Sequence, residues 1–233
     1  MIRRILKVAA LALVALVVIG GVLYLLARNA RNARLAWSSD GARTWTWSDW
    51  RFDTSFGHPA FLNFGRNYAG ARDAYVYVYS PDRDSAYDAA DGLVLARVPA
   101  GGLRDRNAYE FFAGLDVQAR PLWTRDVGGR APVFTHPENV YRSQVSYHPG
   151  LKRYLLCQVL PRGDARFEGG FGIYDAPEPW GPWTTMYFTR TWDVGPGESC
   201  SFPVKWMDAD GAHLVFSGND SFSVRRAEFP RRP

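Results

Sequence analysis

The pattern of apolar and polar positions divides the chain into two unlike parts. Positions 8 to 26 are 19 uncharged, mostly apolar residues in succession, whereas later apolar positions come in runs of six to eight residues. An uninterrupted run of that length is just long enough to cross a bilayer as one helix. Short runs separated by Gly and Pro predict strands, because neither residue suits the middle of a strand. We therefore predict a membrane anchor in residues 1–34, with its helix at about 8–26, and an all-β domain in residues 35–233.

The β-rich part repeats one unit. Residues 140–189 hold four short runs, YRSQVSY, RYLLCQVL, GFGIYDA and WTTMYFT, with Gly- and Pro-rich turns between them. Four strands in about 50 residues is the size of one propeller blade. A similar four-strand unit lies at 59–115, and a three-strand unit lies at 201–229. These units predict an incomplete β-propeller of about three blades, with an outer hairpin before them at 35–50.

An incomplete propeller leaves sheet faces and strand edges uncovered, because closed propellers have at least about four blades. We therefore expect self-association or a partner subunit that completes the propeller. A truncated reading frame is the remaining explanation.

A cleaved signal peptide is the main alternative to a permanent anchor. The segment LLARNARNARLA, which overlaps the end of the apolar run, has no two alanines two positions apart and so lacks the usual cleavage pattern. An uncleaved signal anchor is therefore favoured. Basic residues flank the run on both sides, so the charge distribution barely decides its orientation.

The excess of basic over acidic residues comes from the start of the chain. The formal net charge is +5, but six of the 28 basic residues lie in the first 34 positions, where there are no acidic residues. Residues 35–233 therefore carry 22 basic against 23 acidic groups, a net charge of −1. Without a basic stripe we expect no nucleic-acid partner. The many aromatic residues suit a packed β core or a sugar-stacking surface, and the core accounts for most of them.

The segment SSDGARTWTW contains a motif that predicts a turn. Ser38, Asp40, Thr44 and Trp45 match the Asp-box pattern S-x-D-x-G-x-T-W, with Ala42 in place of the glycine. In sialidase-type propellers this box forms the tight turn between the third and fourth strands of a blade. The Asp carboxylate accepts backbone N–H groups there, and the Trp packs between strands. The motif therefore predicts a structural role and no catalytic one.

Several longer segments resemble known propellers. GFGIYDAPEPWGPWTTMYF is similar to the third-to-fourth-strand segment of five-bladed glycosidases of the arabinanase and β-xylosidase type. More closely, FLNFGRNYAGARDAYVYVYS, YRSQVSYHPGLKRYLLCQVLP, WDVGPGESCSFPVKWM and LVFSGNDSFSVRRA resemble the C-terminal half of a bacterial family of exported propellers, long called a domain of unknown function. Some endo-D-arabinanases belong to that family. The resemblance covers about Trp37 to Phe229.

The resemblance implies a location and a function. It implies a single-pass protein of the cell membrane whose C-terminal domain lies outside, because the related propellers are exported. It also implies a glycoside hydrolase-like domain directed at furanose-rich cell-envelope polysaccharide. The alternative is a non-catalytic carbohydrate-binding or structural propeller fragment. Glycosidases of this architecture use paired carboxylates, but no motif here matches a catalytic one, so the catalytic residues stay unassigned.

Candidate ligand-binding residues follow from the expected architecture. In a propeller, the loops that enter each innermost strand lie on one face, together with the loops that join second and third strands. The entering loops TSFGHP, THPENVYR and DVGPGESC contain polar side chains that could meet a sugar. Glu138 and Arg142 could form an ordinary ion pair or hold a network of sugar hydroxyls. A structural role is the alternative for every candidate; the candidates are His58, His136, Glu138, Tyr141, Arg142 and Glu198.

We expect no metal and no cofactor. The loop PDRDSAYDAADG has four carboxylates, but their spacing is not that of an EF-hand, so a solvated acidic loop is favoured over a Ca²⁺ site. These carboxylates are Asp82, Asp84, Asp88 and Asp91.

The chain has two cysteines, Cys157 and Cys200. An oxidising location would permit a disulfide between neighbouring blades. The alternating pattern LLCQV is equally consistent with a buried thiol, because a free cysteine behaves as a small apolar residue. Of the two, we predict free thiols.

Overall fold

The computed structural model describes residues 33–161, 169–192, 198–218 and 221–229. Contacts divide the chain into two units, Met1–Arg31 and Asn32–Pro233, and all described residues belong to the second unit. The membrane helix expected at 8–26 falls outside the described residues and stays a prediction. Within the described ranges, no helix has the length and apolarity needed to cross a bilayer.

The first sheet is the hairpin of β1 (Arg34–Trp37) and β2 (Thr46–Arg51), which pair antiparallel. In the turn between them, one Asp40 carboxylate oxygen accepts the backbone N–H groups of Arg43 and Thr44 at 3.1 and 3.0 Å. The Thr44 hydroxyl donates to the other oxygen at 2.6 Å. These bonds, the side-chain bond from Thr44 first, hold the pKa of Asp40 well below its usual range. The turn that the Asp-box pattern predicts is therefore present.

The packing expected of Trp45 is wrong. Its side chain is 57% exposed, because the side chains of β2 alternate between two faces. Ser48 and Trp50 face the neighbouring sheet, and Trp45 falls on the opposite, open face.

Six strands follow in the next sheet: β3 (Ala60–Phe61), β4 (Tyr75–Pro81), β5 (Ala90–Pro99), β6 (Glu110–Leu115), β7 (Pro121–Thr124) and β8 (Pro132–Val140). Their order is β3-β4-β5-β6-β7, and β8 pairs with β5. Strands β3 to β6 correspond to the four strands predicted between residues 59 and 115. The prediction of a loop at THPENVYR is wrong for its first six residues, which belong to β8.

The next sheet is a four-stranded antiparallel meander, as predicted. It consists of β9 (Gln144–His148), β10 (Arg153–Pro161), β11 (Gly169–Ala176) and β12 (Thr184–Thr189) in that spatial order. Strand β10 is buried on both faces: Tyr154 and Leu156 pack toward the six-stranded sheet, and Leu155 and Val159 pack toward the last sheet. Burial on both faces explains why its sequence is a nearly continuous apolar run.

The last sheet has three strands, β13 (Ser199–Ser201), β14 (Gly211–Gly218) and β15 (Ser221–Glu228). The strand expected at 201–207 is wrong for most of its length, because the chain turns into the short helix η5 (Val204–Trp206) after Pro203. Four other 3₁₀ turns are η1 (Arg66–Tyr68), η2 (Ala100–Gly102), η3 (Arg106–Ala108) and η4 (Val127–Gly129).

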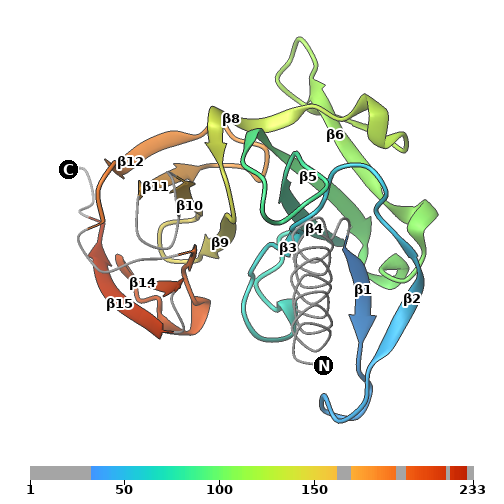
Figure 1. The fold of residues 1–233 in the computed structure, drawn as a ribbon, viewed down its shortest axis with the longest axis horizontal. Helices are drawn as coiled ribbons and strands as arrows, with labels where there is room; N and C mark the ends of the chain where they lie inside the picture. The colour runs from blue at the N-terminus through green and yellow to red at the C-terminus, as the bar shows by residue number, and fades with distance from the viewer. Residues whose placement is uncertain (1–32, 162–168, 193–197, 219–220, 230–233) are drawn as a thin grey trace, which may run out of the picture. The chain divides into compact units, whose positions relative to one another are not determined.

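The first strands of successive sheets adjoin one another (Figure 1). Beside β3, the backbone of Asn63 donates to Val145 and accepts from Tyr147 of β9, both at 3.0 Å. From β9, the Ser146 hydroxyl donates to the carbonyl of Phe202 at 2.7 Å, beyond the end of β13. A four-stranded meander and adjoining first strands are both features of propeller blades.

The two cysteines form a disulfide, so the prediction of free thiols is wrong. Cys157 of β10 and Cys200 of β13 have Cα atoms 5.8 Å apart, within the usual range for a bridge. Alternation along β10 places Cys157 on the face toward the last sheet, where Cys200 belongs to the same apolar cluster. The sequence separation of 43 residues corresponds to a stabilisation of about 4 kcal/mol by restriction of the unfolded chain.

Candidate functional site

The loops before β9 and β13 meet at an ion pair. Arg142 Nη1 donates to Glu198 Oε2 at 2.8 Å, although the two residues are 56 positions apart in sequence. Arg142 Nε also donates to the carbonyl of Ala86, on the loop between β4 and β5, at 3.1 Å. The ion pair considered from the sequence between Arg142 and Glu138 is not among those of the described residues, and Glu198 is the partner of Arg142. Three loops from three sheets converge on one guanidinium.

Two tyrosines lie beside this guanidinium. Its carbon is 5.2 Å from the ring centre of Tyr87 and 5.1 Å from that of Tyr141. Burial raises the pKa of Tyr141, and the negative charges of Glu198 and Asp88 act in the same direction, so its hydroxyl stays protonated. Tyr87 is 51% exposed and leaves ring area open to a ligand. Sugars bind to such rings because their C–H faces stack on them.

His58 enters from the loop before β3. Its Nδ1 is buried and has no hydrogen-bond partner among the described residues. Burial, and after it the charge of Arg142, lowers the pKa of His58. The imidazole is therefore held neutral beside the guanidinium, with its Nδ1 inside the packed loop and closed to solvent. We name His58, Tyr87, Tyr141, Arg142 and Glu198 the Arg142 cluster.

Close backbone packing positions His58. The preceding residue, Gly57, donates its N–H to the carbonyl of Arg83 at 2.8 Å. A Cβ atom on Gly57 would lie 2.3 Å from the carbonyl carbon of Asp84, a distance that no side chain tolerates. The Asp84 carboxylate accepts the backbone N–H of Ser55 at 2.7 Å. The loop before β3 is thus fixed against the loop between β4 and β5.

The acidic loop is more structural than the sequence indicated. Asp82 pairs with Arg130 at 2.7 Å, and Asp91 accepts the backbone N–H of Glu138 at 2.8 Å. These carboxylates hold neighbouring segments and are not simply solvated. Within the described part of the chain, no group of three or more His, Cys, Asp or Glu side chains is arranged to hold a metal ion.

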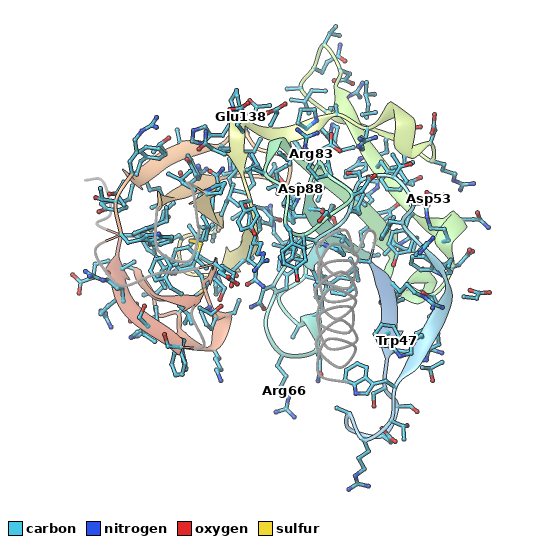
Figure 2. The ribbon with its side chains drawn as sticks, in the orientation of Figure 1. Trp47, Asp53, Arg66, Arg83, Asp88 and Glu138 are labelled. Carbon is cyan, nitrogen blue, oxygen red and sulfur yellow. A yellow bond between two sulfur atoms is a disulfide. The ribbon has the colours of Figure 1, made fainter. Side chains whose placement is uncertain are left out.

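The other two candidates lie on β8. The backbone of Glu138 is bonded to Asp91, and the ring of His136 lies 5.8 Å from that of Phe188 on β12. Figure 2 labels Glu138 on β8, and Asp88 on the loop between β4 and β5. The structure thus brings Tyr141, Arg142 and Glu198 together, places His58 within reach of the charge of Arg142, and gives His136 and Glu138 other contacts.

The sequence interpretation missed Tyr87. The loop between second and third strands was already expected on the ligand face, but only its carboxylates were considered. An exposed aromatic residue in that loop was the signal that could have found it.

A separate groove lies between β12 and β15. Its volume is about 860 Å³, and none of the six candidates lines it. Arg153 and Asp175 form an ion pair at 2.6 Å in its wall, and Tyr187 adds an aromatic surface. This groove is a rival location for a ligand.

Comparison with known proteins gives a structural similarity only. No protein-family model matches the sequence, and no curated protein matches it. An exo-β-1,3-galactanase from Phanerochaete chrysosporium, crystallised with β-1,3-galactotriose, is similar over 84% of this chain at 14% identity, with a TM-score of 0.44. An exo-β-1,3-galactanase from Clostridium thermocellum is similar over 72% of this chain at 14% identity, with a TM-score of 0.44. A GH43_1 enzyme from Xanthomonas citri, complexed with xylotriose, is similar over 84% of this chain at 16% identity, with a TM-score of 0.43.

The similarity concerns part of each of these enzyme chains. The aligned region covers 39% and 38% of the two galactanase chains and 60% of the Xanthomonas citri chain. This chain thus spans about two fifths of the length of the galactanases that it resembles.

Proposed function

We propose that this chain is a membrane-anchored, extracytoplasmic, glycoside hydrolase-like propeller domain that binds furanose-rich envelope polysaccharide at the Arg142 cluster. The observation that carries the proposal is the convergence of three loops on Arg142, with the ring of Tyr87 exposed beside it. The sequence resemblance to exported propellers that include endo-D-arabinanases supports the substrate class.

The chemistry of the cluster suits a neutral sugar. The guanidinium has five N–H donors, of which two are engaged by Ala86 and Glu198 within the described residues. Its planar fork can bond to vicinal hydroxyls. The Glu198 carboxylate can act as a hydrogen-bond acceptor. The ring of Tyr87 supplies the apolar contact that a sugar face needs.

The extracytoplasmic location draws support from the disulfide. Disulfides persist in oxidising compartments and are rare where thiols are kept reduced. A bridge between Cys157 and Cys200 therefore fits a domain that lies outside the membrane. The uncleaved anchor proposed at residues 8–26 fits the same location.

The second candidate function is carbohydrate binding without hydrolysis. It is favoured by the ion pair itself, because Glu198 is bonded to Arg142 and no second carboxylate is assigned to act with it. Hydrolysis requires two carboxyl groups, one on each side of the scissile bond. An assay for release of reducing ends from arabinan separates the two functions, since a binding domain leaves the polymer intact.

The binding test titrates arabinan and arabinogalactan fragments against the full chain in detergent and its Arg142→Gln and Tyr87→Ala variants. Loss of either contact is expected to weaken binding by about 1 to 3 kcal/mol, or about five- to hundredfold. Arg97→Gln is the matched control, because it removes a comparable half-buried ion pair, with Glu110, outside both the cluster and the groove. Equal binding by all four folded proteins would overturn the site, and no binding by the wild type would overturn the function.

A further inference from the structure

The open face of the first hairpin carries two tryptophans. Trp45, directly before β2, is 57% exposed, and Trp47 within β2 is 62% exposed. Because successive side chains of a strand alternate, these two rings lie on the same face. Figure 2 labels Trp47 on this hairpin. We name this surface the Trp45–Trp47 face.

The opposite face of β2 is fully used. The indole N–H of Trp50 donates to the carbonyl of Arg104 at 2.7 Å, and its ring meets that of Tyr109 at 5.5 Å. Ser48 is buried, and its hydroxyl donates to the carbonyl of Trp50. Packing against the six-stranded sheet therefore fixes the hairpin and leaves the Trp45–Trp47 face outward. Adjacent exposed indoles are uncommon on a soluble surface and indicate a contact.

The charges around this face are mainly positive. Arg34, Arg43 and Arg51 are exposed on the hairpin. Asp49, which alternation places on the same face as Trp47, and Asp53, directly after β2, are the exposed acidic residues. Asp40 is engaged by the hydroxyls of the turn. Tryptophan prefers the boundary between hydrocarbon and water, and arginine is attracted to anionic headgroups. The combination matches the surface of an anionic bilayer.

The position of the hairpin in the chain leads to the same partner. The proposed membrane helix ends at Leu26 and β1 begins at Arg34, so seven residues join them. Fully extended, seven residues span at most about 25 Å, which is less than the thickness of a bilayer core of about 30 Å. A hairpin on so short a tether stays close to the membrane surface.

We infer that the Trp45–Trp47 face lies in the headgroup region of an anionic membrane and holds the β domain at a fixed orientation to it. The inference rests on the anchor in the proposed function. It adds a second, non-covalent contact with the membrane, made by the folded domain itself. Such a contact restricts how the domain can turn on its tether.

The sequence offers a direct test, because residues 1–36 contain no tryptophan. Quenching of tryptophan fluorescence by lipid therefore reports on the β domain alone. The full chain is reconstituted into vesicles of phosphatidylcholine and phosphatidylserine brominated near the headgroup end of the acyl chains. Wild type is compared with the Trp45→Phe/Trp47→Phe double variant. Trp206→Phe is the matched control, since Trp206 is also exposed but lies on η5.

Bromolipid is expected to quench the wild type and the control, and to leave the double variant unquenched. Arg43→Gln/Arg51→Gln is expected to reduce the quenching in vesicles that contain phosphatidylserine. Equal quenching of wild type and double variant, or none in either, would overturn the inference. So would a change in the emission of these tryptophans caused by arabinan fragments and not by bromolipid, which would assign the face to glycan binding.

Extraction with alkaline carbonate separates this inference from the anchor. If carbonate leaves the chain in the membrane but the double variant is quenched like the wild type, the anchor is supported and the docking face is refuted. If carbonate releases the chain but the expected quenching pattern is observed, the anchor is refuted and the docking face is supported.

Discussion

The two sides of the Arg142 cluster are held in place by different means. On one side, Glu198 lies two residues before Cys200, whose disulfide ties β13 to β10. On the other side, His58 follows Gly57, which packs directly on the backbone of Asp84. One side is thus fixed by a covalent bond, and the other by close contact and hydrogen bonds.

The two apolar clusters on the two faces of the meander also differ. The cluster between the meander and the last sheet contains the disulfide among aliphatic and phenylalanine side chains. The cluster between the six-stranded sheet and the meander is rich in tyrosine, and its hydroxyls must find partners. Tyr79, for example, is fully buried and donates to the carbonyl of Pro179 at 2.7 Å. The stability of the cluster with the disulfide should therefore depend on redox conditions. The stability of the tyrosine-rich cluster should depend on small changes in side-chain shape or polarity.

The largest expected effect is the loss of the disulfide. The Cys157→Ser/Cys200→Ser variant should lose about 4 kcal/mol of unfolding free energy, because the unfolded chain gains the freedom of a long loop. Urea unfolding of the full chain in detergent measures it. Added reductant should destabilise the wild type and leave the double variant unchanged. Equal stability of wild type with and without reductant would refute the covalent side of the comparison.

The next effect comes from Gly57→Ala. The added methyl group meets the backbone of Asp84, so we expect a loss of about 1 to 3 kcal/mol in stability and displacement of His58. Gly101→Ala is the matched control, because a Cβ there meets nothing within 4 Å. Unfolding and sugar titration are measured on both variants. If the two behave alike, close packing does not position this side of the site.

A smaller effect is expected from Tyr79→Phe. It removes the hydroxyl that donates to Pro179 and leaves a buried carbonyl unpaired, at a cost of about 1 to 2 kcal/mol in unfolding free energy. Tyr87→Phe, at an exposed position, should change stability by less than about 0.5 kcal/mol. A Tyr79→Phe protein as stable as the wild type would remove the distinction between the two clusters.

The smallest effect concerns pH. Burial and the charge of Arg142 lower the pKa of His58 below its ordinary value of 6.5. Below that value the unfolded chain takes up a proton that the folded chain does not, so stability falls as the pH drops and the unfolded His58 becomes protonated. Above it both states are neutral and His58 contributes nothing. The difference in unfolding free energy between wild type and His58→Gln should therefore change below pH 6.5 and stay constant above it.

The sequence predicted most of the strands because Gly and Pro mark their ends. All four strands of the meander lie where the repeat placed them. Strand β8 was missed because its sequence, PVFTHPENV, holds two prolines and polar residues, which normally argue against a strand. It pairs with β5, and the register is interrupted twice along the pair.

The site was less predictable because its partners are distant in sequence. The pattern placed Arg142 and Glu198 at the entries to two innermost strands, but the ion pair it suggested for Arg142 was with Glu138. Only the approach of β9 and β13 brings Glu198 to Arg142. The disulfide shows the same limit: alternation gives the face on which Cys157 lies, but not the residue on the neighbouring sheet that it meets.

A crystal structure with a bound arabinan oligosaccharide tests the central claim most directly. We predict a sugar ring stacked on Tyr87, with hydroxyls within hydrogen-bond distance of the Arg142 guanidinium. A sugar bound only in the groove between β12 and β15, against Tyr187 and the Arg153–Asp175 pair, would contradict the account. An oligosaccharide that makes no contact with either Arg142 or Tyr87 when it binds would also contradict the account.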